Sequence, residues 1–259
     1  MSAEATLQEA QRFLREHAHY REDLGFWRAH ARRLGGPVLD LGAAGGRVAI
    51  TLAGDGHEVW ALDRSPQMLD ALTDAAARAG EEVARRIHPL EADMRSFSLE
   101  RRFPLVAIAM NTLQALTEPA DQLACLGAAA AHLAPGGELI FDVAHPDPGE
   151  IAEGLGEVRE GGSFVDPLTG IELHHAAWYD SWDPLTQTLE FTHRIVEVSP
   201  GGDRAEFLRR HRVHLFMPVE LDHLIARAGL RTIETTGDFA GGPLRAGGET
   251  QIRRCAVAA

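Results

Sequence analysis

The fold of this chain is decided by ten residues, Pro37-Val38-Leu39-Asp40-Leu41-Gly42-Ala43-Ala44-Gly45-Gly46. The stretch begins with a short apolar run typical of a buried strand and ends in a glycine-rich turn. A helical pattern follows and reaches Leu52. Many α/β proteins bind a nucleotide-like cofactor with such a unit, because glycine lets the backbone approach the ligand and the helix N-terminus offers free N–H groups.

The glycine spacing separates the cofactors that this turn could bind. A dinucleotide fingerprint requires glycine at positions 42, 44 and 47, whereas this chain has Gly42, Ala44 and Arg47. A P-loop requires a lysine, and all 25 basic residues of the chain are arginines. The absence of lysine also excludes Schiff-base enzymes, pyridoxal enzymes and protein kinases.

Strands and helices alternate on both sides of this stretch. Apolar residues at helical spacing predict two amphipathic helices between about Ala5 and Leu34. Further strands are expected at residues 58–63, 87–90, 104–110 and 137–143, and further helices at residues 66–76 and 120–133. Ser65-Pro66 predicts the start of the first of these helices, with Ser65 as its N-cap. The alternation predicts an α/β fold with a mainly parallel sheet.

After the fifth strand the pattern changes to β-type alternation, which extends from Gly161 to Phe216. Three turn signals interrupt it, at residues 166–170, 183–186 and 199–202, and the first two share the sequence Asp-Pro-Leu-Thr. A last helix is expected from Pro218 to Gly229, followed by strands at 231–235 and 250–256. We therefore expect one domain formed by residues 1–147 and 217–259, with an antiparallel β insertion at residues 148–216.

Composition limits the partners and the compartment. The chain has 38 acidic and 25 basic residues and a net charge of −13, which argues against a protein that coats nucleic acid. The sequence has neither a signal peptide nor an apolar stretch of membrane-spanning length, so a cytoplasmic protein without membrane contact is expected. Cys125 and Cys255 fit neither a disulfide framework nor a metal motif and are interpreted as packing residues.

The glycine-rich turn resembles motif I of the class I S-adenosylmethionine-dependent methyltransferases, a family that includes enzymes that methylate small molecules. In that motif an acid opens the turn and glycines stand at its first, third and fifth places, here Gly42, Ala44 and Gly46. The chain departs from the pattern at Ala44, which adds one methyl group. The resemblance implies S-adenosylmethionine as the cofactor, with Asp40, Gly42 and Gly46 at its binding site.

Further segments of the chain resemble the same family, in the same order. The segment 62–69 resembles the second-strand signature, which implies that Asp63 binds the ribose hydroxyls, with Arg64 and Met68 beside it. Asp93 and Met94 resemble the adenine site. The resemblance places two more residues at the cofactor: Asn111, the only asparagine, near the methionine end, and Tyr20 as an N-terminal aromatic that covers it. Trp27 fits the covering role or core packing equally well. Leu133-Ala134-Pro135-Gly136-Gly137 is also typical of the family.

The resemblance implies a Rossmann-like sheet of seven strands, mostly parallel with an antiparallel last strand, and methyl transfer to a nitrogen or oxygen atom of a small molecule. His145, directly after the fifth strand, is the candidate general base. The insertion, similar to that of sugar and glycine-type N-methyltransferases, is expected to cover the substrate or to form a homodimer contact. Its aromatic residues Trp178 and Tyr179 are candidate substrate contacts.

Other histidines and arginines of the insertion are interpreted as bystanders. His211 and His214 contribute to opposite faces of an alternating strand. The surrounding run Arg209-Arg210-His211-Arg212 could bind an acidic substrate or partner, but such a run is more often a solvated strand. No histidine pair has metal-ligand spacing, and the carboxylate pattern of magnesium-dependent methyltransferases is absent, so no metal is expected. Two alternatives remain open: a module that binds S-adenosylmethionine without transferring its methyl group, and a nicotinamide-dependent oxidoreductase.

Overall fold

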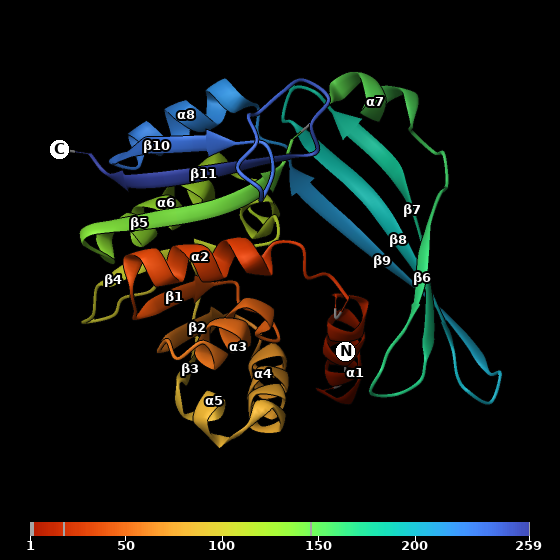
Figure 1. Cartoon of the computed structure of the whole chain (residues 1–259). Helices are drawn as coiled ribbons and strands as arrows, with labels where there is room; N and C mark the ends of the chain where they lie inside the picture. The colour runs from red at the N-terminus through yellow and green to blue at the C-terminus, as the bar shows by residue number, and fades with distance from the viewer. Residues whose placement is uncertain (1–2, 18, 146, 259) are drawn as a thin grey trace.

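The computed structural model of the chain describes residues 3–17, 19–145 and 147–258. The helices are α1 (Ala3–His17), α2 (Leu24–Leu34), α3 (Arg47–Gly54), α4 (Pro66–Ala79), α5 (Glu81–Arg85), the 3-10 helix η1 (Thr112–Ala115), α6 (Pro119–Ala131), α7 (Pro148–Glu153) and α8 (Pro218–Arg227). The strands are β1 (Val38–Leu41), β2 (Val59–Asp63), β3 (Ile87–Glu91), β4 (Phe103–Ile108), β5 (Leu133–Ala144), β6 (Arg159–Val165), β7 (Glu172–Asp183), β8 (Thr188–Val198), β9 (Arg204–His214), β10 (Leu230–Thr236) and β11 (Thr250–Val257). Figure 1 shows that the strands form two separate sheets.

The first sheet has seven strands in the order β10-β11-β5-β4-β1-β2-β3. Strands β1 to β5 pair in parallel, whereas β11 is antiparallel to both β5 and β10. This confirms the predicted α/β sheet, which is mostly parallel and has an antiparallel last strand. Because β1, β2 and β4 are parallel, the loops that follow them start at one edge of the sheet, where open α/β sheets bind their ligands.

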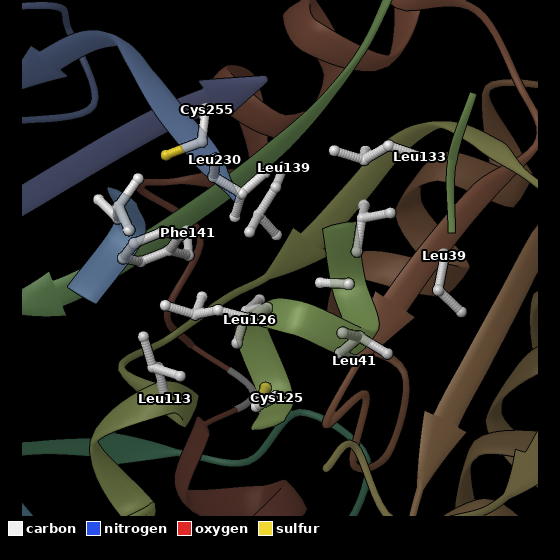
Figure 2. Close-up of a cluster of buried hydrophobic side chains, with 14 of the residues drawn as sticks. Leu39, Leu41, Leu113, Cys125, Leu126, Leu133, Leu139, Phe141, Leu230 and Cys255 are labelled. Atoms are coloured by element: carbon white, nitrogen blue, oxygen red, sulfur yellow. The ribbon is translucent and has the colours of Figure 1, made fainter. Parts of the chain in front are cut away.

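Alternate residues of the first sheet face two different hydrophobic cores. On one face, Leu39, Leu41 and Phe141 pack with Cys125 and Leu126 of α6 (Figure 2). Both cysteines belong to this core, and burial raises the pKa of each thiol to about 12, so the interpretation as packing residues is confirmed. The other face packs against α2, α3 and α4 in a second core. Helices therefore cover both faces, as a parallel sheet requires.

Most expected helices and strands agree with the structure within a few residues, but β5 begins at Leu133 and not at residue 137, and the short helices α5 and α7 are not predicted by the sequence pattern. Ser65 caps α4 as predicted, since its hydroxyl accepts a hydrogen bond from Met68 N at 3.3 Å. Strand β4 ends at Ile108 and not at Met110, because Met110 and Asn111 both have a φ of 60° and cannot continue a strand. None of the described helices is both long and apolar enough to span a membrane.

The second sheet is an antiparallel meander in the order β6-β7-β8-β9. Its two Asp-Pro-Leu-Thr turns use the same chemistry, as predicted. Asp166 accepts hydrogen bonds from Leu168 N (3.2 Å) and the Thr169 hydroxyl (2.5 Å). Asp183 accepts the equivalent bonds from Leu185 N (2.9 Å) and the Thr186 hydroxyl (2.8 Å). An aspartate that satisfies the backbone two residues ahead is a common reason for a chain to turn.

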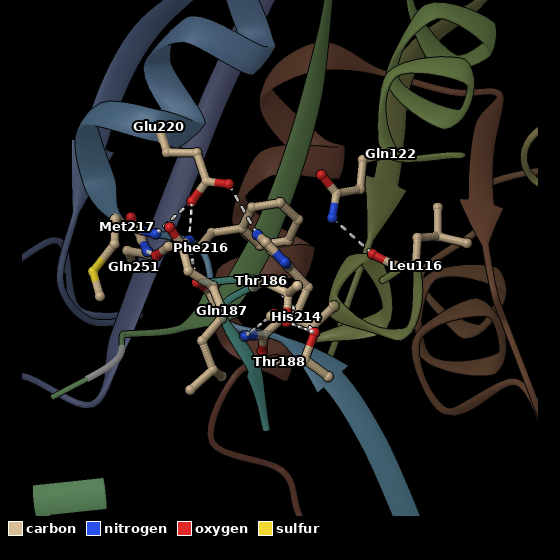
Figure 3. Close-up of polar contacts among 12 residues, drawn as sticks. Leu116, Gln122, Thr186, Gln187, Thr188, His214, Phe216, Met217, Glu220 and Gln251 are labelled. Carbon is tan, nitrogen blue, oxygen red and sulfur yellow. Dashed lines mark hydrogen bonds and ion pairs between the residues drawn. The ribbon is translucent and has the colours of Figure 1, made fainter. Parts of the chain in front are cut away.

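Polar contacts fix the second sheet where β9 returns to the first sheet (Figure 3). Glu220 of α8 accepts a hydrogen bond from Met217 N (3.1 Å), lies 2.9 Å from His214 Nε2 and also bonds Gln187. The side chain of Gln251 in β11 donates to Phe216 O at 2.6 Å. These buried or half-buried hydrogen bonds hold the end of β9 in one position relative to the first sheet.

Helix α1 contacts both the first-sheet domain, through α4, and the second sheet, through β8 and β9. In Figure 1 it lies between α4 and the second sheet. Arg15 of α1 forms an ion pair with Glu197 of β8, and buried Glu16 pairs with Arg209 of β9. The N-terminal helix therefore closes the space between the first sheet and the insertion.

Candidate functional site

A cavity of about 970 Å³ lies at the carboxyl edge of the first sheet. Nine of the ten predicted cofactor residues line it: Tyr20, Asp40, Gly42, Asp63, Arg64, Met68, Asp93, Met94 and Asn111. The second sheet and its first turn contribute Asp166, Leu168, Thr169, Phe191, His211 and Val213. The cavity is thus bounded by the predicted cofactor loops on one side and by the insertion on the other.

The glycine-rich turn brings the backbone close to its neighbours. Gly42 has a φ of 72° and a Cβ at this position would overlap the Thr112 side chain, so only glycine fits. Gly46 has a φ of 81°, caps α3 and packs against Leu72, but it does not line the cavity. In the structure Gly46 shapes the start of α3, and its predicted contact with the cofactor stays a prediction. Ala44, the departure from the motif, has a φ of 46°, a conformation that L-residues seldom adopt.

Asp63, at the end of β2, anchors the turn. Its Oδ2 accepts a hydrogen bond from Ala44 N at 2.9 Å, and its Oδ1 accepts one from Ser65 N at 2.9 Å. An ionised carboxylate has about four acceptor positions, so roughly two remain for a ligand. Asp63 can therefore hold the turn and still accept hydrogen bonds from two ribose hydroxyls.

Asp40 lies at the end of β1, where it is 3% exposed and lines the cavity. Burial raises its pKa to about 7, against a partly compensating attraction to Arg47. Such a carboxyl group is half protonated near neutral pH and becomes ionised when a cation binds beside it. The site thus contains an acid whose charge responds to a positively charged ligand.

Asp93 is already engaged in the structure. Arg95 donates to both carboxylate oxygens, with Nε at 2.9 Å from Oδ1 and Nη2 at 2.6 Å from Oδ2, and also bonds Asp121. The hydrogen bonds from Arg95 lower the pKa of Asp93 to about 2. The predicted bond from an adenine amine to Asp93 therefore requires Arg95 to release part of this carboxylate. Sequence reasoning missed Arg95, whose second partner Asp121 lies 26 residues further along the chain.

Asp142, which sequence reasoning missed, holds the loop after β4. Its two carboxylate oxygens accept hydrogen bonds from Met110 N (2.8 Å) and Asn111 N (3.0 Å), the two residues with left-handed backbone. Burial raises the pKa of Asp142 to about 6. The carboxylate of β5 therefore stabilises an uncommon conformation that places Asn111 at the cavity wall.

Arg47 fixes the segment between α1 and α2 that carries Tyr20 and Asp23. This residue stands where a dinucleotide fingerprint has its third glycine, and its guanidinium bonds both oxygens of fully buried Asp23, at 2.5 and 2.7 Å. Arg47 also donates to Tyr20 O and lies 5.1 Å from the Tyr20 ring. Trp27 is fully buried in the core and donates to Asp23 at 2.9 Å, so core packing is its role. Of these two aromatics, Tyr20 lines the cavity and Trp27 does not.

His145, Trp178 and Tyr179 do not line the cavity. His145 N donates to Glu249 O at 2.8 Å, which continues the pairing of β5 with β11 on the side of β5 away from β4 and β1. Trp178 is bonded to Asp180 at the surface of the second sheet. Tyr179 packs with Ile151 of α7 in a small separate core. The strand residues of the second sheet that do line the cavity are Phe191, His211 and Val213. Within the described residues, no cluster of histidine, cysteine, aspartate or glutamate has the arrangement of a metal site.

Comparison with known proteins agrees with this geometry. A sequence profile described as a methyltransferase domain matches residues 38–137, which contain the glycine-rich turn, Asp63, Asp93 and Asn111. The chain is 32% identical over 223 residues to the cypemycin N-terminal methyltransferase of a Streptomyces species, covering 85% of this chain and 83% of that protein.

Two solved structures are similar over nearly the whole chain. The CcbJ methyltransferase of Streptomyces caelestis has a TM-score of 0.74 and 29% identity, and the match covers 93% of this chain and 92% of that one. The glycopeptide N-methyltransferase MtfA in complex with S-adenosylmethionine has a TM-score of 0.60 and 25% identity, with 92% and 96% coverage.

Proposed function

Since this chain belongs to the class I S-adenosylmethionine-dependent methyltransferases, we propose that it transfers a methyl group to a nitrogen or oxygen atom of a small-molecule acceptor. S-adenosylmethionine is the cofactor of this family and, when bound, supplies a methyl group made electrophilic by its sulfonium. The protein then has to bind the cofactor, orient the acceptor and exclude water.

The observation that carries the proposal is that the predicted cofactor loops and the insertion line one and the same cavity. Its volume of about 970 Å³ lies at the upper end of the range for small-molecule sites, which leaves room for an acceptor beside the cofactor. A module that only binds S-adenosylmethionine needs no space for an acceptor beside the cofactor. The wall formed by Phe191, His211 and Val213 is the surface on which we expect the acceptor to rest.

The residues of the cavity suit S-adenosylmethionine. Asp63 has acceptor positions free for the ribose hydroxyls, and Met94 and Ala92 offer apolar contacts for a base at the same edge. Asp40 supplies a carboxylate for the positively charged end, and Asn111, in the loop after β4, lines the same cavity. Helix α1 and Tyr20 cover the cavity and keep water from the transferred group.

An amine is the first acceptor to test. The relatives named above include an N-terminal and a glycopeptide N-methyltransferase, and neutral amines are better nucleophiles than hydroxyl groups. The protein is incubated with S-adenosylmethionine carrying a trideuterated methyl group and with peptides with free N-termini, amino sugars or phenols, and the products are identified by mass spectrometry. A deuterated methyl group on nitrogen or oxygen supports the proposal. Tight cofactor binding without transfer to any of these three classes favours the binding module.

The raised pKa of Asp40 predicts that cofactor affinity depends on pH. Below pH 7 the carboxyl group is largely protonated, and a bound cation must displace its proton, so S-adenosylmethionine should bind more tightly as pH rises to 7. A pKa of about 7 corresponds to a gain on the order of tenfold between pH 5.5 and pH 7. Calorimetry in two buffers of different ionisation enthalpy measures both the affinity and the released proton. In Asp40→Asn, which cannot ionise, the gain should vanish; an equal gain in both proteins would contradict this role.

A further inference from the structure

One histidine of the insertion lies at the acceptor wall. The register of β8 and β9 pairs Phe191 with His211 and Leu189 with Val213. Because side chains alternate along a strand, His211 and Val213 share one face of the sheet, and both line the cavity together with Phe191. His214 faces the other way, toward Glu220, as the alternation predicts. His211 therefore belongs to the functional cavity, unlike the other members of its basic run.

A glutamine clamp places this part of β9 next to the loop after β4. Buried Gln114 of η1 donates to His214 O at 3.0 Å, and its side-chain oxygen accepts a hydrogen bond from Ala144 N at 3.0 Å. Helix η1 starts directly after Asn111, and Asn111 and Thr112 line the same cavity as His211. The clamp therefore fixes the end of β9 against the loop after β4, and His211 lines the same cavity as Asn111.

The His211 ring is positioned and available. It stacks on Phe191 with 4.6 Å between ring centroids and 13° between planes. Among the described residues, no hydrogen bond occupies either of its ring nitrogens. Burial, and then the nearby Arg209 of its own strand, lower its pKa. His193 of β8 also faces it, and Arg209 is itself paired with Glu16 of α1. The imidazole is therefore neutral at neutral pH and can accept a proton.

We propose that His211 contacts the acceptor and takes up the proton that its nucleophilic nitrogen or oxygen loses during methyl transfer. The acceptor's lone pair forms the bond to the methyl carbon, and the electron pair of the broken S–C bond remains on sulfur, which becomes a neutral thioether. The proton moves from the acceptor atom to a ring nitrogen of His211, and from there to solvent. This inference rests on the proposed function, because it requires the acceptor to lie between the cofactor and the second sheet.

The first test needs no acceptor. The pKa of His211 is measured by NMR on protein labelled at histidine, assigned with His211→Gln, in the presence of S-adenosylmethionine or of S-adenosylhomocysteine. The two ligands differ in the positive charge of the sulfonium, so a histidine near the methyl group should have a lower pKa with the methylated ligand, by about half a pH unit or more. His174, which faces outward beside Glu172, is the control and should not respond.

Each outcome of this titration decides the proposal. A lower His211 pKa with S-adenosylmethionine supports it. Equal values with both ligands overturn it, because His211 would then lie too far from the transferred group. If calorimetry shows that neither ligand binds, the proposed function has failed first, and the role of His211 falls with it.

The second test uses whichever amine or phenol probe accepts the deuterated methyl group. His211→Gln should lower kcat at pH 7 by about 100-fold or more, the usual contribution of a general base, while cofactor affinity stays unchanged. The deficit should shrink at high pH, where the probe loses its proton to solvent. His174→Gln should retain full activity. A His211→Gln protein with unchanged kcat and an unchanged pH profile would contradict a proton-accepting role.

Discussion

Asp63→Ala should lower the affinity for S-adenosylhomocysteine about 100-fold, or ~3 kcal/mol, in calorimetry. Two effects combine in this loss. The carboxylate can no longer accept hydrogen bonds from the ribose hydroxyls, and hydrogen bonds to a charged group contribute about 1.5–3 kcal/mol. The turn also loses its anchor, because Asp63 bonds Ala44 N at 2.9 Å and Ala44 has the unusual φ of 46°.

The matched control for this variant is Glu91→Ala. Glu91 stands opposite Asp63 in the parallel pairing of β2 and β3, but it does not line the cavity. Its removal changes the net charge by the same amount and should leave the affinity within about threefold, as expected for an exposed charge that does not line the cavity. Equal losses in the two variants would mean that Asp63 acts only through its charge. An unchanged affinity in Asp63→Ala would remove Asp63 from the site.

Arg47→Gln should lower the free energy of unfolding by about 3–5 kcal/mol, as measured by urea denaturation. Asp23 is fully buried, and its two oxygens are bonded by Arg47 at 2.5 and 2.7 Å. Without the guanidinium, a buried carboxylate is left without its counter-charge, which is the costly part of breaking such a pair. The loss should also loosen Tyr20, whose carbonyl oxygen accepts a hydrogen bond from Arg47.

Two further variants separate this ion pair from a general effect of losing an arginine. Asp23→Asn combined with Arg47→Gln should recover part of the lost stability, because the amide still accepts from Trp27 and leaves no unpaired charge. Arg64→Gln removes an arginine that lines the same cavity and should change stability by less than about 0.5 kcal/mol. A loss below about 1 kcal/mol in Arg47→Gln would contradict the assigned role.

Local sequence signals predict the elements around the cavity. The apolar run before Asp40, the glycines of the turn and the Ser65-Pro66 cap depend on residues that are neighbours in the chain, and the structure has each where it was expected. The antiparallel insertion was recognisable for the same reason, since alternation and Asp-Pro turns are local properties.

The residues that complete the site depend on contacts between distant parts of the chain. Asp142 reaches Asn111 across 31 residues, and the place of His211 depends on the register between β8 and β9 and on the Gln114 clamp. One sequence does not encode such registers in a readable form. The position of His145 after a strand makes it a candidate, but strand order determines which strand ends meet, and the end of β5 is paired with β11.

A crystal structure with S-adenosylhomocysteine bound tests the central claim most directly. We predict the ligand in the 970 Å³ cavity, with both ribose hydroxyls within hydrogen-bond distance of Asp63 and its sulfur on the side of Asn111, facing His211 across the space for the acceptor. A ligand bound outside this cavity, or one whose ribose does not contact Asp63 and whose sulfur faces away from the second sheet, would contradict the account.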